Sequence, residues 1–171
     1  MKRTSVTILL FLATLFALVV YIQPTWAKPQ PQLLKVNYED LNKNARQQVD
    51  CLAQNMYFES GWEPEAGQIA VAMVTLNRLE SGRYANTICG VVKQKIADTC
   101  QFSWVCAPKK PITMPVQWKE SREIAESILI SQKKYSTIRG AMFFHADYVK
   151  PAWASTKDFV QQIGRHLFYK D

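Results

Sequence analysis

The chain has 171 residues, of which 48% are hydrophobic and 20% charged, with 6 Gly and 8 Pro. This composition excludes collagen-like, low-complexity and globally disordered proteins, and the length suits a single folded domain. The 21 Lys and Arg residues outnumber the 14 Asp and Glu residues and give a net charge of +7. A surplus of this size favours a polyanionic partner, which leaves nucleic acid, an anionic membrane and an anionic wall polymer open.

The N-terminal segment has the plan of an export signal. Lys2 and Arg3 precede an apolar run over residues 6–22, and Ala27 supplies a small residue at the expected cleavage position. This pattern predicts a signal peptide over residues 1–27. The main alternative is an uncleaved membrane anchor, because the apolar run is at the lower length limit for crossing a bilayer, and a buried core helix is the third interpretation. The signal peptide and the anchor both place the rest of the chain outside the cytoplasm, in the periplasm, the cell wall or the extracellular space.

After the export signal, residues 28–37 carry two prolines and few apolar side chains, which predicts a linker before a folded domain over residues 38–171. Apolar residues then recur at steps of three and four over residues 39–58, the spacing of one helical face. A second helix is predicted over 64–80, apolar nearly all round and therefore central in the core. A third helix is predicted over 116–132.

The remaining segments are irregular and point to a small β element. Residues 87–92 and 101–105 are short β-branched runs that favour extended structure. Residues 140–148 and 165–169 suit aromatic-rich strands, and a short helix is predicted over 157–163. The fold class is therefore mostly α, an α+β domain with a small β element.

Four cysteines lie in the exported part of the chain, and an even number outside the cytosol suggests disulfides. Cys100 and Cys106 bracket a short segment, so a local clip between them is natural, which leaves Cys51 to pair with Cys89. The alternative is four buried free thiols. No metal site is predicted, because the chain has no CxxC pattern and only two histidines. No cofactor is predicted either.

Glu59 is the candidate catalytic residue. It lies three positions after Met56, so a carboxyl group continues the apolar stripe into the last turn of the first predicted helix. Burial and the helix C-terminus both raise the pKa of such a carboxyl, which can then donate a proton to a leaving oxygen. The alternative is a frayed helix end that exposes Glu59 to water. Glu63 lies at the start of the second helix, where the dipole favours an ionised carboxylate and capping is the more common role.

Five ordered sequence blocks accompany Glu59. The first joins Tyr57-x-Glu59 to Glu63-Pro64-x-x-Gly67-Gln68. The others are Ile88-Cys89-Gly90-Val91-Val92, Cys100-Gln101-Phe102-Ser103-Trp104, Phe143-Phe144-His145 with Pro151-x-Trp153, and Ile163-Gly164-x-His166-x-Phe168-Tyr169. With these blocks the chain resembles the SleB-type cell-wall hydrolases, the family of spore-cortex-lytic enzymes, over about residues 46–171.

The resemblance implies a lysozyme-like fold related to the lytic transglycosylases. It also implies cleavage of peptidoglycan glycan strands between N-acetylmuramic acid and N-acetylglucosamine, with Glu59 as the single catalytic acid and base. A hydrolytic muramidase and an amidase are the alternative activities. The two histidines are thin support for a zinc amidase, which needs several metal ligands.

Six further side chains are predicted to bind the substrate: Tyr57, Gln101, Ser103, Trp104, His145 and Trp153. The aromatic rings would stack on sugar faces, and the polar groups would hydrogen-bond acetamido groups. Each has a structural alternative in the core or at the solvent surface. Asn77 and Arg78 are predicted to be structural, with Asn77 bonding to nearby backbone and Arg78 complementing the end of its helix.

The rival interpretation is a non-enzymatic, exported module that binds a wall polymer through its basic surface and aromatic residues. We favour the enzyme, because a carboxyl group on an apolar helix face serves no purpose in a polyanion binder. Peptidoglycan is the expected partner, nucleic acid is not, and a monomer is expected.

Overall fold

The computed structural model describes residues 36–132, 135 and 138–171. The predicted signal peptide or anchor over residues 1–27, and all but the last two residues of the predicted linker, lie outside the described residues. Within the described part, no helix combines the length and apolarity needed to span a bilayer.

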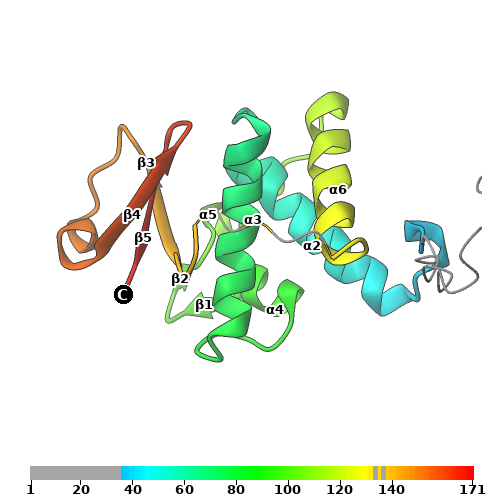
Figure 1. The fold of residues 1–171 in the computed structure, drawn as a ribbon, viewed down its shortest axis with the longest axis horizontal. Helices are drawn as coiled ribbons and strands as arrows, with labels where there is room; N and C mark the ends of the chain where they lie inside the picture. The colour runs from blue at the N-terminus through cyan, green and yellow to red at the C-terminus, as the bar shows by residue number, and fades with distance from the viewer. Residues whose placement is uncertain (1–35, 133–134, 136–137) are drawn as a thin grey trace, which may run out of the picture. The chain divides into compact units, whose positions relative to one another are not determined.

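Three long helices pack together in the described fold (Figure 1). They are α2 (Lys43–Ser60), α3 (Glu65–Glu80) and α6 (Pro115–Leu129), which confirms the three predicted helices. The side chain of Asn42 accepts a hydrogen bond from the Ala45 N–H and caps the start of α2. A single 3-10 turn, η1 (Tyr38–Asp40), precedes it.

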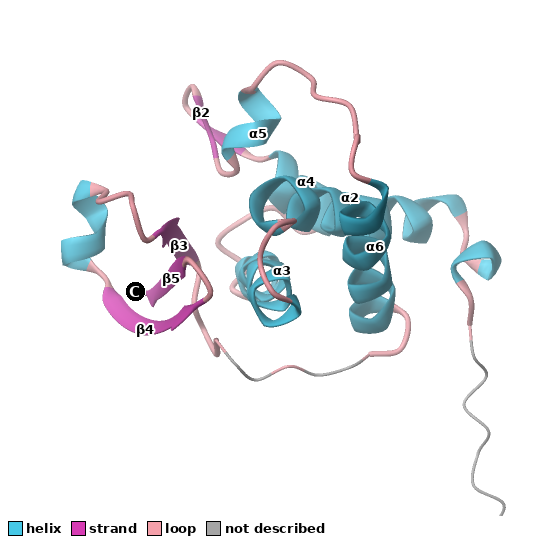
Figure 2. Cartoon of the chain, turned by 90° about the horizontal axis from the view of Figure 1, so that it is seen from above, coloured by secondary structure: helices cyan, strands magenta, loops and turns pink. Residues whose placement is uncertain are grey.

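Helix α3 lies between the other long helices and the sheet in both ribbon views (Figures 1 and 2). Its buried residues contribute to two apolar clusters. The first is built around α2 and includes Leu52, Met56, Ile69 and Ile128. The second joins α3 to the sheet and includes Ala70, Val71, Val74 and Phe168. The nearly continuous apolar surface of this helix therefore reflects its central position, as predicted.

The sheet has three antiparallel strands in the order β3-β5-β4. They are β3 (Phe143–Ala146), β4 (Asp158–Ile163) and β5 (His166–Lys170), and a 3-10 turn, η2 (Ala152–Thr156), lies between β3 and β4. The strands predicted within 140–148 and 165–169 are confirmed. The short helix predicted over 157–163 is wrong, because this segment pairs with β5 through a tight turn at Gly164, whose φ of +56° suits glycine.

Two segments predicted to be extended are helical. Residues 87–92 fall mainly in α4 (Ile88–Lys93), where the buried Ile88, Val91 and Val92 follow helical rather than strand spacing. The Thr87 side chain caps this helix by accepting from the Gly90 N–H. Residues 101–105 lead into the single turn α5 (Ser103–Cys106). Burial of one helical face therefore overrides the β-branched composition of 87–92.

A small hairpin and two disulfides complete the described part. The hairpin pairs β1 (Lys95–Ile96) with β2 (Thr99–Cys100). Cys51 pairs with Cys89 and joins α2 to α4, while Cys100 pairs with Cys106 and closes the segment that contains α5. Both predicted disulfides are therefore confirmed.

Candidate functional site

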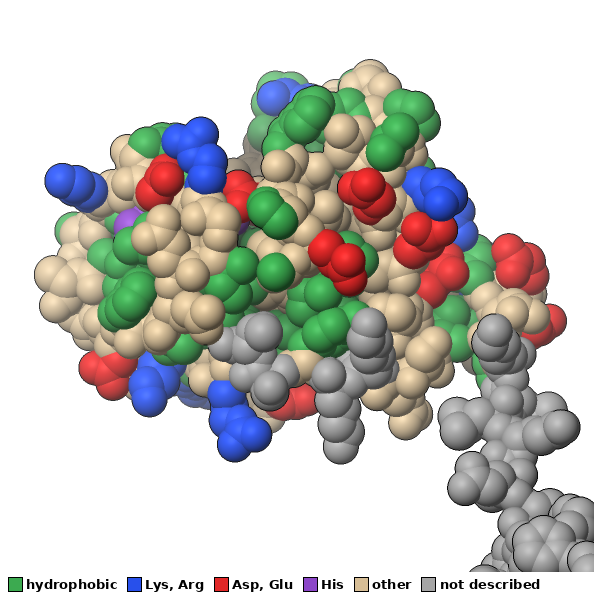
Figure 3. Space-filling view, turned by 45° about the horizontal axis from the view of Figure 1, so that its top comes forward, with side chains coloured by type: hydrophobic (Ala, Val, Ile, Leu, Met, Phe, Trp, Pro, Cys, Tyr) green, Lys and Arg blue, Asp and Glu red, His purple; other side chains and the backbone are tan. Residues whose placement is uncertain are grey.

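Glu59 lies in the last turn of α2 and lines a cavity of about 720 Å³. Residues from the α2–α3 turn, from the loop before α6 and from the sheet complete the walls. The lining residues include Tyr57, Glu59, Trp62, Glu63, Lys110, Tyr148, Arg165 and His166. The surface is hollowed between the part over the sheet and the part over the helices, at the top of Figure 3. The cavity is therefore assembled from segments about 100 residues apart in the chain.

The carboxyl group of Glu59 is partly buried in this wall. Burial raises its pKa from 4.5 to about 7, and the positive charge of Arg78 opposes this rise. The direction predicted from the apolar stripe is therefore confirmed, with burial as the largest cause. A carboxyl with this pKa is substantially protonated near neutral pH, the state that a general acid requires.

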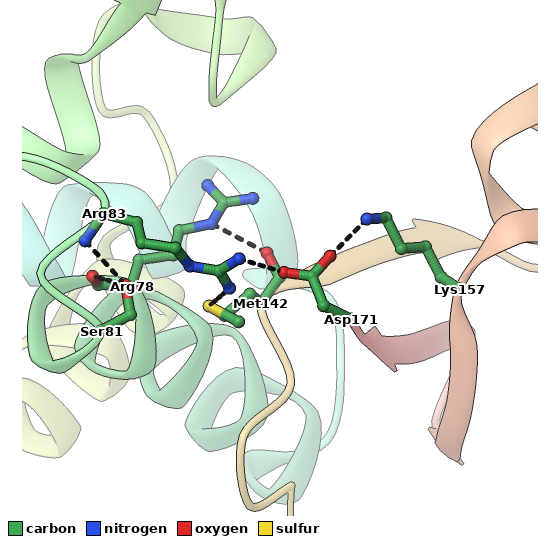
Figure 4. A network of polar contacts seen from close by, with 6 residues as sticks. All are labelled: Arg78, Ser81, Arg83, Met142, Lys157 and Asp171. Carbon is green, nitrogen blue, oxygen red and sulfur yellow. Dashed lines mark hydrogen bonds and ion pairs between the residues drawn. The ribbon is translucent and has the colours of Figure 1, made fainter.

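Arg78 lies in the last turn of α3, the position from which it was predicted to complement the helix end, and it makes further contacts that were not predicted. Its guanidinium group is buried, with its carbon 4.9 Å from the centre of the Phe102 ring and 5.3 Å from that of Tyr84. Its Nε donates a 2.9 Å hydrogen bond to the carbonyl oxygen of Met142. Figure 4 shows Arg78 and Arg83 both reaching Met142, with Arg83 also paired to Asp171. Arg78 thus links α3 to the sheet and supplies a buried cation that acts on Glu59.

Asn77, beside Arg78 in α3, bonds to backbone as predicted. Its side-chain nitrogen donates to the carbonyl oxygens of Ile138 and Ala141, at 3.2 and 2.8 Å. These bonds fix the segment that leads into β3. The end of α3 therefore fixes the sheet at several points.

Glu63 holds the β4–β5 turn against the α2–α3 turn. Its Oε2 accepts a 2.9 Å hydrogen bond from the backbone N–H of Arg165. A Cβ atom on Gly164 would lie 1.9 Å from the same oxygen, so only glycine permits this approach. The contact brings Arg165 and His166 to the wall that Glu59 also lines.

Gly164→Ala is expected to lower both stability and activity, because the added methyl group displaces the Glu63 carboxylate. Gly82→Ala is the matched control, since Gly82 also has a positive φ, +66°, but has nothing within 4 Å of the added Cβ. The control variant should lose about 1 kcal/mol of unfolding free energy through the backbone alone, and Gly164→Ala about 2 kcal/mol or more. Urea denaturation measures both. Equal losses would contradict a structural role for the Glu63 contact.

Tyr57 lines the cavity, but its hydroxyl group is committed to the protein backbone. The oxygen accepts hydrogen bonds from the N–H groups of Thr113 and Met114, at 3.1 and 3.2 Å. The ring packs edge-on against Phe58 and Trp118. Tyr57 therefore fixes the loop before α6 at the edge of the cavity.

Trp104 and Ser103 line a second hollow of about 1000 Å³, which shares Phe58, Lys110 and Pro111 with the Glu59 cavity. The Trp104 ring stacks on Phe58 with their centres 4.7 Å apart. Its Nε1 donates a 3.0 Å hydrogen bond to the side-chain oxygen of Asn55. The two hollows therefore adjoin near the end of α2, and together they are called the groove below.

The structure does not bring His145, Trp153 or Gln101 to this groove. His145 stacks on Tyr169 with ring centres 5.3 Å apart, and Trp153 packs against both rings. These contacts lie on the face of the sheet opposite Phe168, which packs against α3. Gln101 donates its backbone N–H to the Gln94 carbonyl and lines neither hollow.

His166 lines the cavity although it was not predicted as a site residue. It is buried, and its burial lowers its pKa, with the charges of Glu63 and Asp147 opposing this shift. Its Nδ1 has no hydrogen-bond partner among the described residues. The motif containing Gly164 and His166 was the signal available in the sequence. No group of three or more His, Cys, Asp or Glu side chains in the described part is arranged to hold a metal ion.

Comparison with known proteins identifies a family of similar sequences. The sequence model of the family described as Cell Wall Hydrolase matches residues 62–169, beginning just after Glu59. A spore cortex-lytic enzyme of Oceanobacillus iheyensis is 30% identical over 124 residues, 71% of this chain and 41% of the relative. One from Bacillus cereus is 28% identical over 130 residues, 75% of this chain and 46% of the relative. The chain thus spans less than half the length of these curated relatives.

Solved structures show the same fold. The catalytic domain of a germination-specific lytic transglycosylase, SleB from Bacillus anthracis, matches 76% of this chain and 97% of its own, with a TM-score of 0.57 and 24% identity. The catalytic domain of the Bacillus cereus SleB protein matches 73% of this chain and 91% of its own, with a TM-score of 0.53 and 26% identity. The expected lysozyme-like α+β fold is therefore confirmed.

Proposed function

Because this chain belongs to the Cell Wall Hydrolase family, we propose that it cleaves peptidoglycan glycan strands as a lytic transglycosylase with Glu59 as its catalytic acid. The observation that carries this proposal is a partly buried glutamic acid with a pKa of about 7 on the wall of an open groove. The family match itself does not include Glu59. The catalytic role is therefore argued from its position and its pKa.

In the proposed reaction, protonated Glu59 donates its proton to the oxygen that joins N-acetylmuramic acid to N-acetylglucosamine. The bond between that oxygen and the anomeric carbon of the muramoyl residue breaks, and positive charge develops on the sugar ring. The Glu59 carboxylate then takes the proton of the muramoyl 6-hydroxyl group. That oxygen bonds to the anomeric carbon and closes an anhydro ring. One carboxyl group thus serves as acid and base, and Glu59 returns to its protonated form.

The other groove residues receive supporting roles in this proposal. Tyr57 holds one wall of the cavity in place, and Glu63 holds the β4–β5 turn on the opposite side. Trp104 offers an aromatic face for a sugar ring, and exposed Ser103 offers a hydroxyl group for an acetamido group. The positions of Gln101, His145 and Trp153 favour structural roles for these residues.

The products of digestion test the proposal. Purified peptidoglycan treated with the protein should release anhydro-muropeptides, which mass spectrometry distinguishes because each is lighter by one water than the hydrolysis product. Products with free reducing ends would identify a hydrolytic muramidase instead. Release of peptides from intact glycan would identify an amidase. Binding without any cleavage would identify a wall-polymer binding module and would refute the enzyme.

We also propose that the protein works outside the cytoplasm, where its substrate lies. Two disulfides within the described domain suit an oxidising compartment. The predicted signal peptide or membrane anchor over residues 1–27 would supply the route of export. Periplasm, cell wall and extracellular space are all compatible with these features.

A further inference from the structure

The second hollow along the groove has walls of one charge. Lys93, Lys109 and Lys110 line it together with apolar and uncharged residues, and no Asp or Glu among the described residues lines it. The Glu59 cavity contrasts with it, because two carboxyl groups, Glu59 and Glu63, line that part of the groove. The groove therefore changes from mixed charge to purely basic along its length.

The three lysines are available to a ligand. All three are exposed, and none takes part in an ion pair with another described residue. A basic group surrounded by acidic neighbours would be neutralised within the protein, whereas these charges face the groove without a counterion. Their combined field attracts an anion to this part of the groove.

The segments that carry the lysines are held in place. Lys93 ends α4, which the Cys51–Cys89 disulfide joins to α2. Lys109 and Lys110 lie between the Cys100–Cys106 clip and the residues that Tyr57 holds by hydrogen bonds. A positioned set of charges recognises an anion with a smaller loss of conformational entropy than a set on a free loop.

We propose that this basic hollow binds the carboxylates of the stem peptides on muramic acid, so that the substrate is a peptide-bearing glycan rather than a bare one. This inference rests on the proposed function. Each stem peptide is attached through the lactyl group of a muramoyl residue and carries ionised carboxylates near neutral pH. A strand lying in the groove with its scissile bond at Glu59 would place a neighbouring stem at the lysines. Phe58, Lys110 and Pro111 line both hollows, so the basic hollow adjoins the Glu59 cavity.

A phosphate-rich wall polymer is the competing anion. The adjacency of the two hollows favours the stem peptide, because the anion then belongs to the same strand that Glu59 cleaves. A separate polymer would have to share the groove with the glycan. The position of the lysines thus favours an anion covalently linked to the scissile strand.

The test compares glycan strands with intact stem peptides and strands from which an amidase has removed them. The wild-type protein should show kcat/KM about tenfold higher on stem-bearing strands at low salt, and about 0.5 M salt should remove most of this preference. Lys93→Gln combined with Lys109→Gln should bring the ratio of the two kcat/KM values close to one. Lys43→Gln combined with Lys170→Gln removes the same charge from exposed positions outside both hollows. This control should keep the wild-type ratio.

A binding measurement separates this inference from the proposed function. The inactive Glu59→Gln variant should bind stem-bearing strands more tightly than denuded ones, and more tightly than a soluble phosphodiester polymer. Equal cleavage of both strands by the wild type would overturn the stem-peptide inference and leave the proposed function standing. Tighter binding of the phosphodiester polymer would overturn it too. Cleavage of neither strand would refute both.

Discussion

Glu59→Gln should lower the rate of glycan cleavage by about 10²- to 10⁴-fold, the contribution typical of general acid–base catalysis. Glutamine has nearly the same shape as protonated glutamic acid, so it occupies the same site at the end of α2 without a transferable proton. The loss should appear in kcat, with binding of the glycan retained. Turbidity loss of purified sacculi and the rate of muropeptide release measure the effect.

The pKa of Glu59 predicts how wild-type activity varies with pH. Because the pKa is about 7, the carboxyl holds its proton below neutral pH and loses it above. The cleavage rate should therefore fall about tenfold for each pH unit beyond this value. A rate that stays constant to alkaline pH would contradict Glu59 as the acid.

Above neutral pH, the Glu59→Gln variant should have a higher unfolding free energy than the wild-type protein. The pKa of Glu59 is about 7 in the folded state against an ordinary value of 4.5, so between these values the folded state binds a proton that the unfolded chain does not. Stability contributed by the neutral carboxyl is complete below pH 4.5 and is lost as the pH rises through 7. Neutral glutamine avoids this loss, on the order of 2 kcal/mol. Urea denaturation of both proteins at about pH 5 and about pH 8 measures the difference.

Two variants control for this result. Glu65→Gln removes an exposed carboxylate outside the Glu59 cavity and should keep wild-type activity and wild-type pH dependence of stability. Glu63→Gln retains an oxygen that can accept from the Arg165 N–H, so it should retain most activity. Loss of activity in Glu63→Gln with an active Glu59→Gln would transfer the catalytic role to Glu63.

The helices were predictable because their signals are local. Apolar residues at helical spacing identify α2 and α3, and the same spacing placed Glu59 on a buried stripe. The segment that forms β4 lacks such a signal, because its strand structure depends on pairing with β5. The segment that forms α4 was predicted to be extended, because its β-branched residues favour strands. The same residues also fill one face of a short buried helix. In both cases, tertiary contacts override local preference.

The sequence predicted Glu59 and three other residues that line the groove, Tyr57, Ser103 and Trp104, but it did not identify His166. Glu59 can be identified from the spacing of apolar residues along its own helix. His166 reaches the cavity only because β5 pairs with β3. His145 and His166 each lie in a strand, where successive side chains point to opposite faces of the sheet. His166 lines the cavity, whereas His145 packs against Tyr169 on the other face. Strand register is a long-range property that a single sequence does not reveal.

Arg78 illustrates a second limit of sequence reasoning. A basic residue in the last turn of a helix has an obvious local role, which is to complement the helix dipole. Its actual environment depends on Phe102, Tyr84 and Met142, which surround it only in the folded domain. The charge that lowers the pKa of Glu59 therefore comes from a neighbouring helix, at a position where the sequence indicates only a role at the helix end.

Removing the Cys51–Cys89 disulfide is expected to cause the largest loss of stability. The bridge spans 38 residues, and the loop-closure model gives about 4 kcal/mol of unfolding free energy for a loop of this length. The double substitution Cys51→Ala and Cys89→Ala should lower the unfolding free energy by at least this amount, because Cys51 is buried in the α2 core and its smaller replacement also loses packing contacts. Urea denaturation under non-reducing conditions measures the loss.

The second disulfide provides the matched control. Cys100 and Cys106 are separated by only 6 residues, so Cys100→Ala with Cys106→Ala should cost about 2 kcal/mol on the same model. This pair holds the segment that carries Trp104. Its removal should therefore raise KM, with a smaller loss of unfolding free energy than removal of the Cys51–Cys89 disulfide causes. The Cys51 and Cys89 variant should show the reverse, with near-normal KM at low temperature and a lower Tm. Equal stability losses in the two variants would contradict the loop-closure argument, and an unchanged KM in the second would show that the clip does not position the groove.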